Sequence, residues 1–478
     1  MKRRAALAAL ALLLAGCASL ERPALRADDA QTASCRQWFA ALDDAVDRAG
    51  VRDAEDEPIE GFPGLRVNRL TAALAPRANA SDEALVAWVQ RLRRQDIDAR
   101  ELEIANLPRG HAFVHDRLDA CSLQLGAAAQ SDAQARRLLV ERARVPARYS
   151  NASRVLGLYA LTRLPFLAGV EAWQREHELA MKEAAISPRA ARRFVPDAPV
   201  STTPIAVALT RDALGLPHID AATAEQLLAA HAPLFDIEQQ GDFDRPGAPA
   251  WQADGRVAID TARPVVYQRL AQTLVRGQAL VQLVYTLWFP ERPKRGAFDL
   301  LGGALDGVIV RITLGPDGKP VLLDTIHACG CYHLFFPAQG IALRPDAPKD
   351  EEWAFVPASL PEWAPDKRFV IRIASATHYV LGVSAATQAD DSNSRYSLRP
   401  ESDLRSLPRP DGSRRSLYNP DGLVAGSERA ERFLFWPMGI ASAGAMRQWG
   451  HHATAFVGRR HFDDADLIER RFAIPGLE

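Results

Sequence analysis

Residues 323–337 read LDTIHACGCYHLFFP, and no other segment of the chain concentrates as many reactive side chains. Histidine and cysteine occupy every second position at its centre, at His327, Cys329, Cys331 and His333. Successive side chains of a β-strand point to opposite faces, so an extended stretch would direct all four to the same face. The stretch therefore predicts a strand that carries a functional site, and we expect the rest of the chain to be arranged around it.

These four side chains are typical ligands of a transition metal. Thiolate and imidazole together suit zinc or copper better than magnesium or calcium. Two cysteines separated by one residue lie close enough on a strand to share one ion, whereas His327 and His333 lie roughly 20 Å apart if the strand is fully extended. A single site therefore requires either a bulge at Gly330 or ligands from another segment.

A second group of histidines, near the C-terminus, can supply such ligands. His451, His452 and His461 lie beside Asp463 and Asp464, and carboxylates can orient ligating imidazoles. We expect a composite zinc or copper site in which an imidazole of this group approaches a cysteine sulfur. The predicted metal ligands are His327, Cys329, Cys331, His333, His451, His452 and His461.

Two alternatives use the same residues differently. Cys329 and Cys331 can be structural, either as buried thiols or as a bridge across one residue, with the histidines as satisfied core residues. A nucleophilic role is the other alternative, with one cysteine attacking and His333 or His452 as its base. The chain contains no Gly-rich phosphate loop, no nucleophile elbow and no zinc-protease His-Glu helix.

The flanking sequence indicates a β-rich domain over residues 265–478. Residues 279–289 read ALVQLVYTLWF, a composition typical of strands. Residues 308–313 and 321–327 flank GPDGKP, which predicts a hairpin whose second arm runs into the site. Residues 369–374 and 378–383 predict further strands. We expect this domain to be antiparallel.

Residues 34–264 predict a mainly helical region, because their apolar residues recur at three and four positions. Ser81 is a good N-cap for a helix that follows it. Residues 149–186 contain an apolar run with Pro165 inside, which predicts two short helices with a bend at the proline. We expect this run to be core, with a partner surface or a membrane-facing groove as the alternative. The predicted fold class is α+β.

The N-terminal residues have the pattern of an export signal. Lys2, Arg3 and Arg4 precede a short apolar segment, and residues 14–17 read LAGC. This combination resembles the lipobox of bacterial lipoproteins. The resemblance implies a signal peptide over residues 1–16, cleavage before Cys17 and lipid on that cysteine, with residues 17–33 as a tether. Ala18 in place of Asp at the next position implies the outer membrane.

The remaining cysteines follow from this compartment. Cys35 and Cys121 are distant in sequence, and a disulfide between them is the expected pairing in an oxidising envelope. A formal net charge of −1 gives no electrostatic case for nucleic acid.

The functional hypothesis is a periplasmic lipoprotein, anchored in the outer membrane, that holds zinc or copper. The alternative is a non-enzymatic envelope lipoprotein that binds a protein partner, with Cys329 and Cys331 structural. The residues do not identify a reaction.

Overall fold

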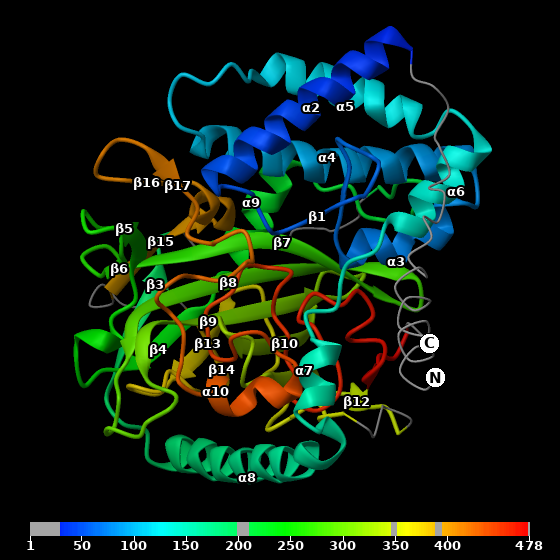
Figure 1. Ribbon diagram of the computed structural model, residues 1–478. Coiled ribbons are helices and arrows are strands. Elements are labelled where there is room, and N and C mark those ends of the chain that lie inside the picture. The colour runs from blue at the N-terminus through cyan, green and yellow to red at the C-terminus, as the bar shows by residue number, and fades with distance from the viewer. Residues whose placement is uncertain (1–28, 198–209, 346–350, 388–393, 477–478) are drawn as a thin grey trace, which may run out of the picture.

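The computed structural model describes residues 29–197, 210–345, 351–387 and 394–476. The predicted signal peptide, Cys17 and most of the predicted tether lie outside these residues. Most of the helices belong to the N-terminal half, and a large sheet dominates the C-terminal half (Figure 1). The predicted α+β class is confirmed.

The N-terminal helices form a layer above the sheet in Figure 1. They are α2 (Ala30–Ala49), α3 (Arg69–Ala78), α4 (Asp82–Asn106), α5 (His115–Ala128) and α6 (Ala133–Arg142). The hydroxyl of Ser81 accepts a hydrogen bond from the Ala84 N–H, as the N-cap prediction requires. Trp88 of α4 shares a hydrophobic core with Leu274 and Ala279, which lie at the turn between two inner strands of the sheet. This core attaches the helical layer to the sheet.

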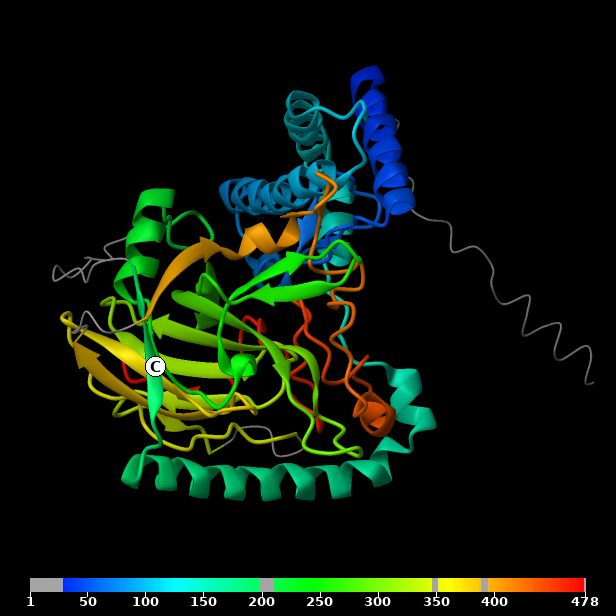
Figure 2. The same ribbon diagram turned by 90° about the vertical axis from the view of Figure 1, so that its left-hand side faces the viewer.

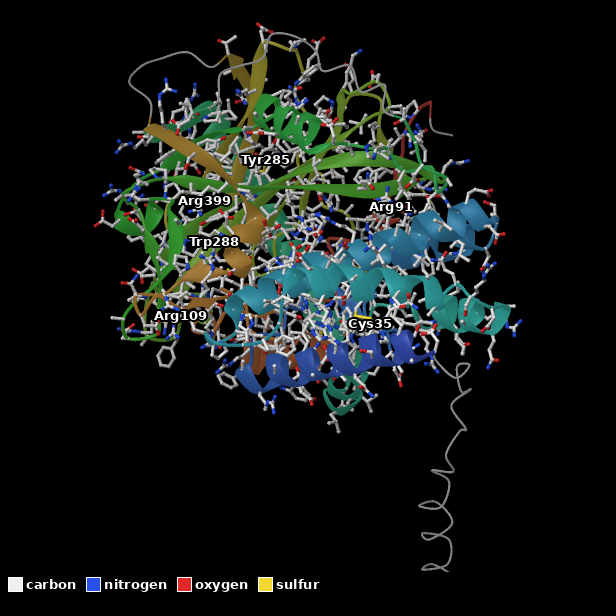
Figure 3. The ribbon with its side chains drawn as sticks, turned by 90° about the horizontal axis from the view of Figure 1, so that it is seen from above. Cys35, Arg91, Arg109, Tyr285, Trp288 and Arg399 are labelled. Carbon is white, nitrogen blue, oxygen red and sulfur yellow. A yellow bond between two sulfur atoms is a disulfide. The ribbon has the colours of Figure 1, made fainter. Side chains whose placement is uncertain are left out.

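A disulfide joins Cys35 of α2 to Cys121 of α5 (Figure 3). Both cysteines are buried in the core between α2, α4 and α5. The predicted pairing is therefore confirmed.

The main sheet has ten strands in the order β11-β10-β9-β8-β7-β15-β3-β4-β13-β14. The strands are β3 (Ala191–Pro196), β4 (Leu234–Glu238), β7 (Val265–Val275), β8 (Gln278–Arg292), β9 (Gly303–Leu314), β10 (Pro320–His327), β11 (Leu334–Pro337), β13 (Lys367–Ile373), β14 (Val380–Thr387) and β15 (Ser394–Pro400). The predicted hairpin is present, with β9 and β10 paired so that Thr313 lies opposite Leu322.

The prediction of an antiparallel sheet is only partly right. Strands β7 to β11 form an antiparallel meander, but β15 pairs parallel with both β7 and β3, and β4 pairs parallel with β13. Parallel neighbours need long crossover connections, and here strands from distant parts of the sequence enter one sheet. β3 and β4 come from residues before 265, within the region predicted to be mainly helical.

One hydrophobic core joins both ends of the sheet. Leu323 of β10 and Phe336 of β11 belong to the same cluster of buried residues as Ile371 of β13 and Val380 of β14. The sheet therefore curves strongly, so that its two end strands face a common core.

Two further helices follow the N-terminal layer, α7 (Asn151–Leu156) and α8 (Tyr159–Ile186). The break between them lies at Gly157 and Leu158, and α8 continues through Pro165, so the predicted division into two short helices at the proline is wrong. The core prediction is also wrong, because Leu161 and Leu164 are exposed. α8 runs along the side of the sheet opposite the N-terminal helices (Figures 1 and 2).

The other elements are short. They are β1 (Glu57–Pro58), β2 (Arg66–Val67), α9 (Ala221–Ala230), η1 (Asp242–Asp244), β5 (Ala248–Trp251), β6 (Val257–Asp260), β12 (Ala342–Leu343), η2 (Glu401–Arg405), β16 (Leu407–Pro408), β17 (Arg414–Arg415), α10 (Arg432–Phe435), η3 (Trp436–Met438) and β18 (Phe472–Ala473).

Candidate functional site

The stretch of alternating His and Cys is a hairpin, not one strand. β10 ends at His327 and β11 begins at Leu334, and the two strands pair antiparallel. The His327 N–H donates to the Cys331 carbonyl at 3.0 Å, which closes the connecting loop of residues 328–333. The prediction of an extended strand with four side chains on one face is therefore wrong.

Gly330 is the reason for the reversal. Its φ of +92° lies in the left-handed region, which costs glycine little. A Cβ at this position would also lie 2.6 Å from the Ala453 carbonyl oxygen, so the loop packs closely against the C-terminal segment.

Cys329 and Cys331 are free thiols; Cys329 is buried and Cys331 is half-buried. Their side chains are hydrogen-bonded to each other, and this contact, together with burial, raises the pKa of Cys331 well above its ordinary value. The Cys331 thiol is therefore protonated at neutral pH. Because the thiolate is the nucleophilic form, this environment does not favour Cys331 as a nucleophile.

The two histidines of the hairpin are held by buried carboxylates. Nδ1 of His327 lies 3.4 Å from an oxygen of Asp306. Nε2 of His333 lies 2.7 Å from Asp324, which also accepts a hydrogen bond from Arg311. Burial lowers the pKa of His333 to about 3. Each imidazole thus has a partner of its own.

The C-terminal histidines lie near the hairpin but have other partners. Nε2 of His452 lies 3.1 Å from the Ala328 carbonyl oxygen, which places it at the base of the cysteine loop. Nε2 of His451 lies 2.6 Å from the Ala54 carbonyl oxygen. His461 accepts a hydrogen bond from the Arg148 N–H and lies 3.3 Å from Asp464. The structure brings the two segments together mainly through backbone groups.

No group of three or more His, Cys, Asp or Glu side chains in the described part of the chain is arranged to hold a metal ion. The predicted zinc or copper site stays a prediction, and its remaining structural basis is the pair of thiols.

A buried chain of four ionisable side chains lies behind the hairpin loop. Nδ1 of His378 lies 2.8 Å from an Asp306 oxygen, and its Nε2 lies 3.5 Å from Asp244. Because Asp306 also faces His327, the order is Asp244, His378, Asp306, His327. The His378 ring stacks on Phe289 at 4.0 Å, which fixes its plane.

The backbone around this chain is strained. Leu305 precedes Asp306 with φ +57°, and Tyr332 in the hairpin loop has φ +60°. Ala376 and His378 have φ +63° and +53°. Non-glycine residues with such angles cost free energy and cluster at functional sites, because the surrounding structure must hold them in place. The strained backbone therefore indicates a functional site here, independently of the side-chain chemistry.

A pocket of about 540 Å³ opens between α8, α10 and the hairpin loop. Most of its lining is apolar or aromatic, from α8, α10 and the segment before β18. The residues that line it include Phe166, Gly169, Val170 and Trp173 of α8, Cys329, Gly330, Cys331 and Tyr332 of the hairpin, and Trp353, Tyr379, Glu431, Leu434, Phe435, Ile440 and Phe456.

Two tyrosines form a polar part of the pocket wall at the hairpin loop, and His333, Glu352 and Arg460 are further polar residues of the lining. The rings of Tyr332 and Tyr379 lie 4.7 Å apart, and both contact His327, which lies behind them. Arg292 donates a hydrogen bond to the Tyr379 hydroxyl at 3.0 Å and lies over both rings. Burial raises the pKa of Glu431 to about 7 against the opposing effect of Arg292, so this carboxyl group is partly protonated near neutrality.

Several residues of this region were not predicted from the sequence. Asp306 lies on β9, whereas His378 and Tyr379 lie in the connection between β13 and β14, and none of the three belongs to a local motif. Glu431 and Trp173 were also missed. The sequence offered only an indirect signal for Trp173. This residue lies in the segment 149–186, for which a membrane-facing groove was one alternative to a core role.

No helix among the described residues combines the length and the apolar character that crossing a bilayer requires. No protein-family model, no curated protein and no solved structure matches this chain.

Proposed function

We propose that this protein is a periplasmic lipoprotein, anchored in the outer membrane, that binds a ligand with a long apolar part in the pocket between α8 and α10. The observation that carries the binding function is the pocket itself. Its volume of about 540 Å³ and its mainly apolar lining are typical of sites for small organic ligands. An acyl chain is the ligand class that fits such walls.

The few polar groups of the pocket would orient the ligand. Tyr332, Tyr379 and Glu431 lie together at the hairpin side, while the α8 side presents Phe166 and Val170. Buried polar groups need hydrogen-bond partners, so the polar end of a ligand gains most at the tyrosines. The apolar part then lies along α8 and α10.

Two features favour binding over catalysis. The Cys331 thiol is protonated at neutral pH, and the His327 imidazole lies behind two tyrosine rings. Neither group is presented to the pocket in a reactive form. This agrees with the non-enzymatic alternative, with a small apolar ligand in place of a protein partner.

Filling the pocket tests the proposal. Gly169 lines the pocket, and a Cβ built on it meets no atom within 4 Å, so Gly169→Phe can occupy the space without displacing neighbours. A fluorescent fatty acid titrated into the delipidated protein should bind the native chain and bind Gly169→Phe at least tenfold more weakly. Ala168→Phe is the matched control, because it adds the same ring at an exposed position of the same helix. Equal affinity of both variants would reject this pocket as the site.

The transition-metal site is the second candidate, and the contact between the two thiols favours it. Cys329 and Cys331 together offer two soft ligands at the pocket wall. Elemental analysis after mild purification tests this candidate. About one zinc or copper per chain, lost in Cys329→Ser and Cys331→Ser, would support it, and retention should weaken in mild acid because the ligands must be deprotonated. Metal-free protein would favour structural thiols.

A further inference from the structure

α7, the first turns of α8 and the residues between them expose large apolar side chains. We call the residues Val155, Leu156, Leu158, Leu161 and Leu164 the apolar face. Val155 and Leu156 are 74% and 77% exposed, so neither packs against the rest of the chain. Leu179 lies five helical turns after Leu161 on the same side of α8 and is also exposed, with the exposed Arg175 and Glu176 between them. Contiguous exposed apolar surface of this kind marks an interaction site.

The apolar face continues into the mouth of the pocket. Phe166 of α8 contacts Phe435 of α10, with ring centroids 5.2 Å apart. Next to Phe435, both Phe433 and Leu434 of α10 are exposed, and Leu434 also lines the pocket. A ligand that leaves the pocket at α10 therefore meets an apolar surface before it meets water.

Arginines predominate around this surface, although Glu171 of α8 and Glu431 at the pocket border it. Residues 142–170 contain arginines but no Asp or Glu, and the same is true of residues 432–462. Arg459 is exposed beside α7, where it donates a hydrogen bond to Asn151. Arg163 lies between the leucines of the apolar face, and Arg432 begins α10. An apolar stripe with basic residues beside it is the pattern of helices that lie in the interface of an anionic membrane.

We propose that the apolar face docks on the surface of a bilayer that contains anionic lipids, with α7, α8 and α10 in the interfacial region and the pocket mouth facing the acyl chains. The docking stands on the surface features alone. Only the passage of an acyl chain from the bilayer into the pocket rests on the proposed function.

The docking is independent of the predicted lipid anchor. α8 and the start of α2, where the described chain begins, lie at opposite ends of the molecule (Figures 1 and 2). The test therefore uses the chain from Ala18 onward, which keeps every described residue and lacks Cys17. Any vesicle binding of this protein must come from its folded surface.

Vesicle flotation measures the docking. Vesicles of phosphatidylcholine with phosphatidylglycerol should retain the protein several-fold better than phosphatidylcholine alone, and high salt should reduce the difference. Leu161→Glu with Leu164→Glu should weaken binding to the mixed vesicles about tenfold or more, since two leucines lose their apolar burial. Leu123→Glu is the matched control, because Leu123 is an exposed leucine of α5 in the helical layer at the far end.

The outcomes separate this inference from the proposed function. The double variant should keep its unfolding midpoint and its affinity for the fluorescent fatty acid in solution, because neither leucine lines the pocket. Loss of vesicle binding with retained fatty-acid binding supports the docking surface. An equal effect of Leu123→Glu, or absence of binding to both vesicle compositions, would overturn it and leave a protein partner or a second copy as the occupant.

Discussion

His378 and Asp306 are joined through Nδ1 and a carboxylate oxygen 2.8 Å apart, and both side chains are buried. Burial alone would raise the pKa of Asp306, but His327 and His378 outweigh it and hold the pKa well below the ordinary carboxyl range. The carboxylate is therefore ionised throughout the neutral range. It orients two imidazoles that come from different segments of the sheet.

The first prediction concerns this carboxylate. Asp306→Asn removes the charge that faces His327 and His378, and loss of one partner from a buried charged group costs about 3 kcal/mol or more. We expect urea unfolding followed by circular dichroism to show a free energy of unfolding lower by about this amount. Asp366→Asn, at an exposed position, is the control and should change stability little. A variant as stable as the native protein would show that the chain of four groups does not support the fold.

The second prediction concerns acid. Burial lowers the pKa of His177, His231 and His451 to about 4 and of His333 and His452 to about 3. A histidine with a lowered folded-state pKa stays neutral in the fold while the unfolded chain takes up a proton below its ordinary pKa, about 6.5. Its contribution is therefore full above that pH and is lost as the pH falls toward the folded value.

Each of these five histidines can reduce stability by up to about 1.4 kcal/mol per pH unit over this window. We expect the urea midpoint to fall steeply between pH 6.5 and pH 4. In His231→Gln the free energy of unfolding should depend less steeply on pH, because unfolding then takes up as much as one proton fewer. His378 acts in the opposite direction: its pKa is raised because hydrogen bonds to Asp244 and Asp306 outweigh burial, so its contribution is lost as the pH rises above its ordinary value. Similar midpoints at pH 7 and pH 5 would contradict the prediction.

The third prediction concerns the disulfide. Cys35 and Cys121 are 86 residues apart, and closing a loop of this length contributes roughly 4–5 kcal/mol in the chain-entropy model, often less in practice. Replacing both cysteines with alanine should lower the free energy of unfolding by a few kcal/mol. Non-reducing peptide mapping of the native protein should show the two peptides linked. Ready alkylation of both cysteines without reductant would show that the bond is absent in solution.

The fourth prediction concerns the anchor. If residues 14–17 act as a lipobox, the mature protein begins at Cys17 and carries acyl groups that intact-mass measurement detects. Cys17→Ser should leave a protein without lipid that no longer partitions with the membrane fraction. Unchanged partitioning of this variant would reject the assignment.

Features with local causes were predictable from the sequence. The β9–β10 hairpin follows from turn residues between two apolar runs, and the cap at Ser81 follows from its side chain. The disulfide was predictable from the count of cysteines together with the predicted compartment.

Features that depend on distant contacts were not predictable. β15 enters the sheet between β7 and β3, and nothing in its own residues shows that its neighbours are parallel. The alternation of residues 327–333 indicated a strand, but Gly330 and the close approach of Ala453 fold it into a loop. Asp306 and His378 meet only because the beginning of β9 lies close to the connection between β13 and β14.

The last prediction concerns the thiols. The hydrogen bond from Cys329 and burial raise the pKa of Cys331, so little thiolate exists at pH 8. Alkylation of Cys331 by iodoacetamide should be slower than that of a free thiol, and its rate should continue to rise with pH beyond the ordinary cysteine range. Cys329→Ala removes the largest cause of the shift, so Cys331 should react faster at pH 8 in that variant. A bound fatty acid should slow alkylation in both proteins, because Cys331 lines the pocket. An unchanged rate in Cys329→Ala would show that burial alone controls this thiol, and a rate unaffected by the fatty acid would separate the thiol from the ligand site.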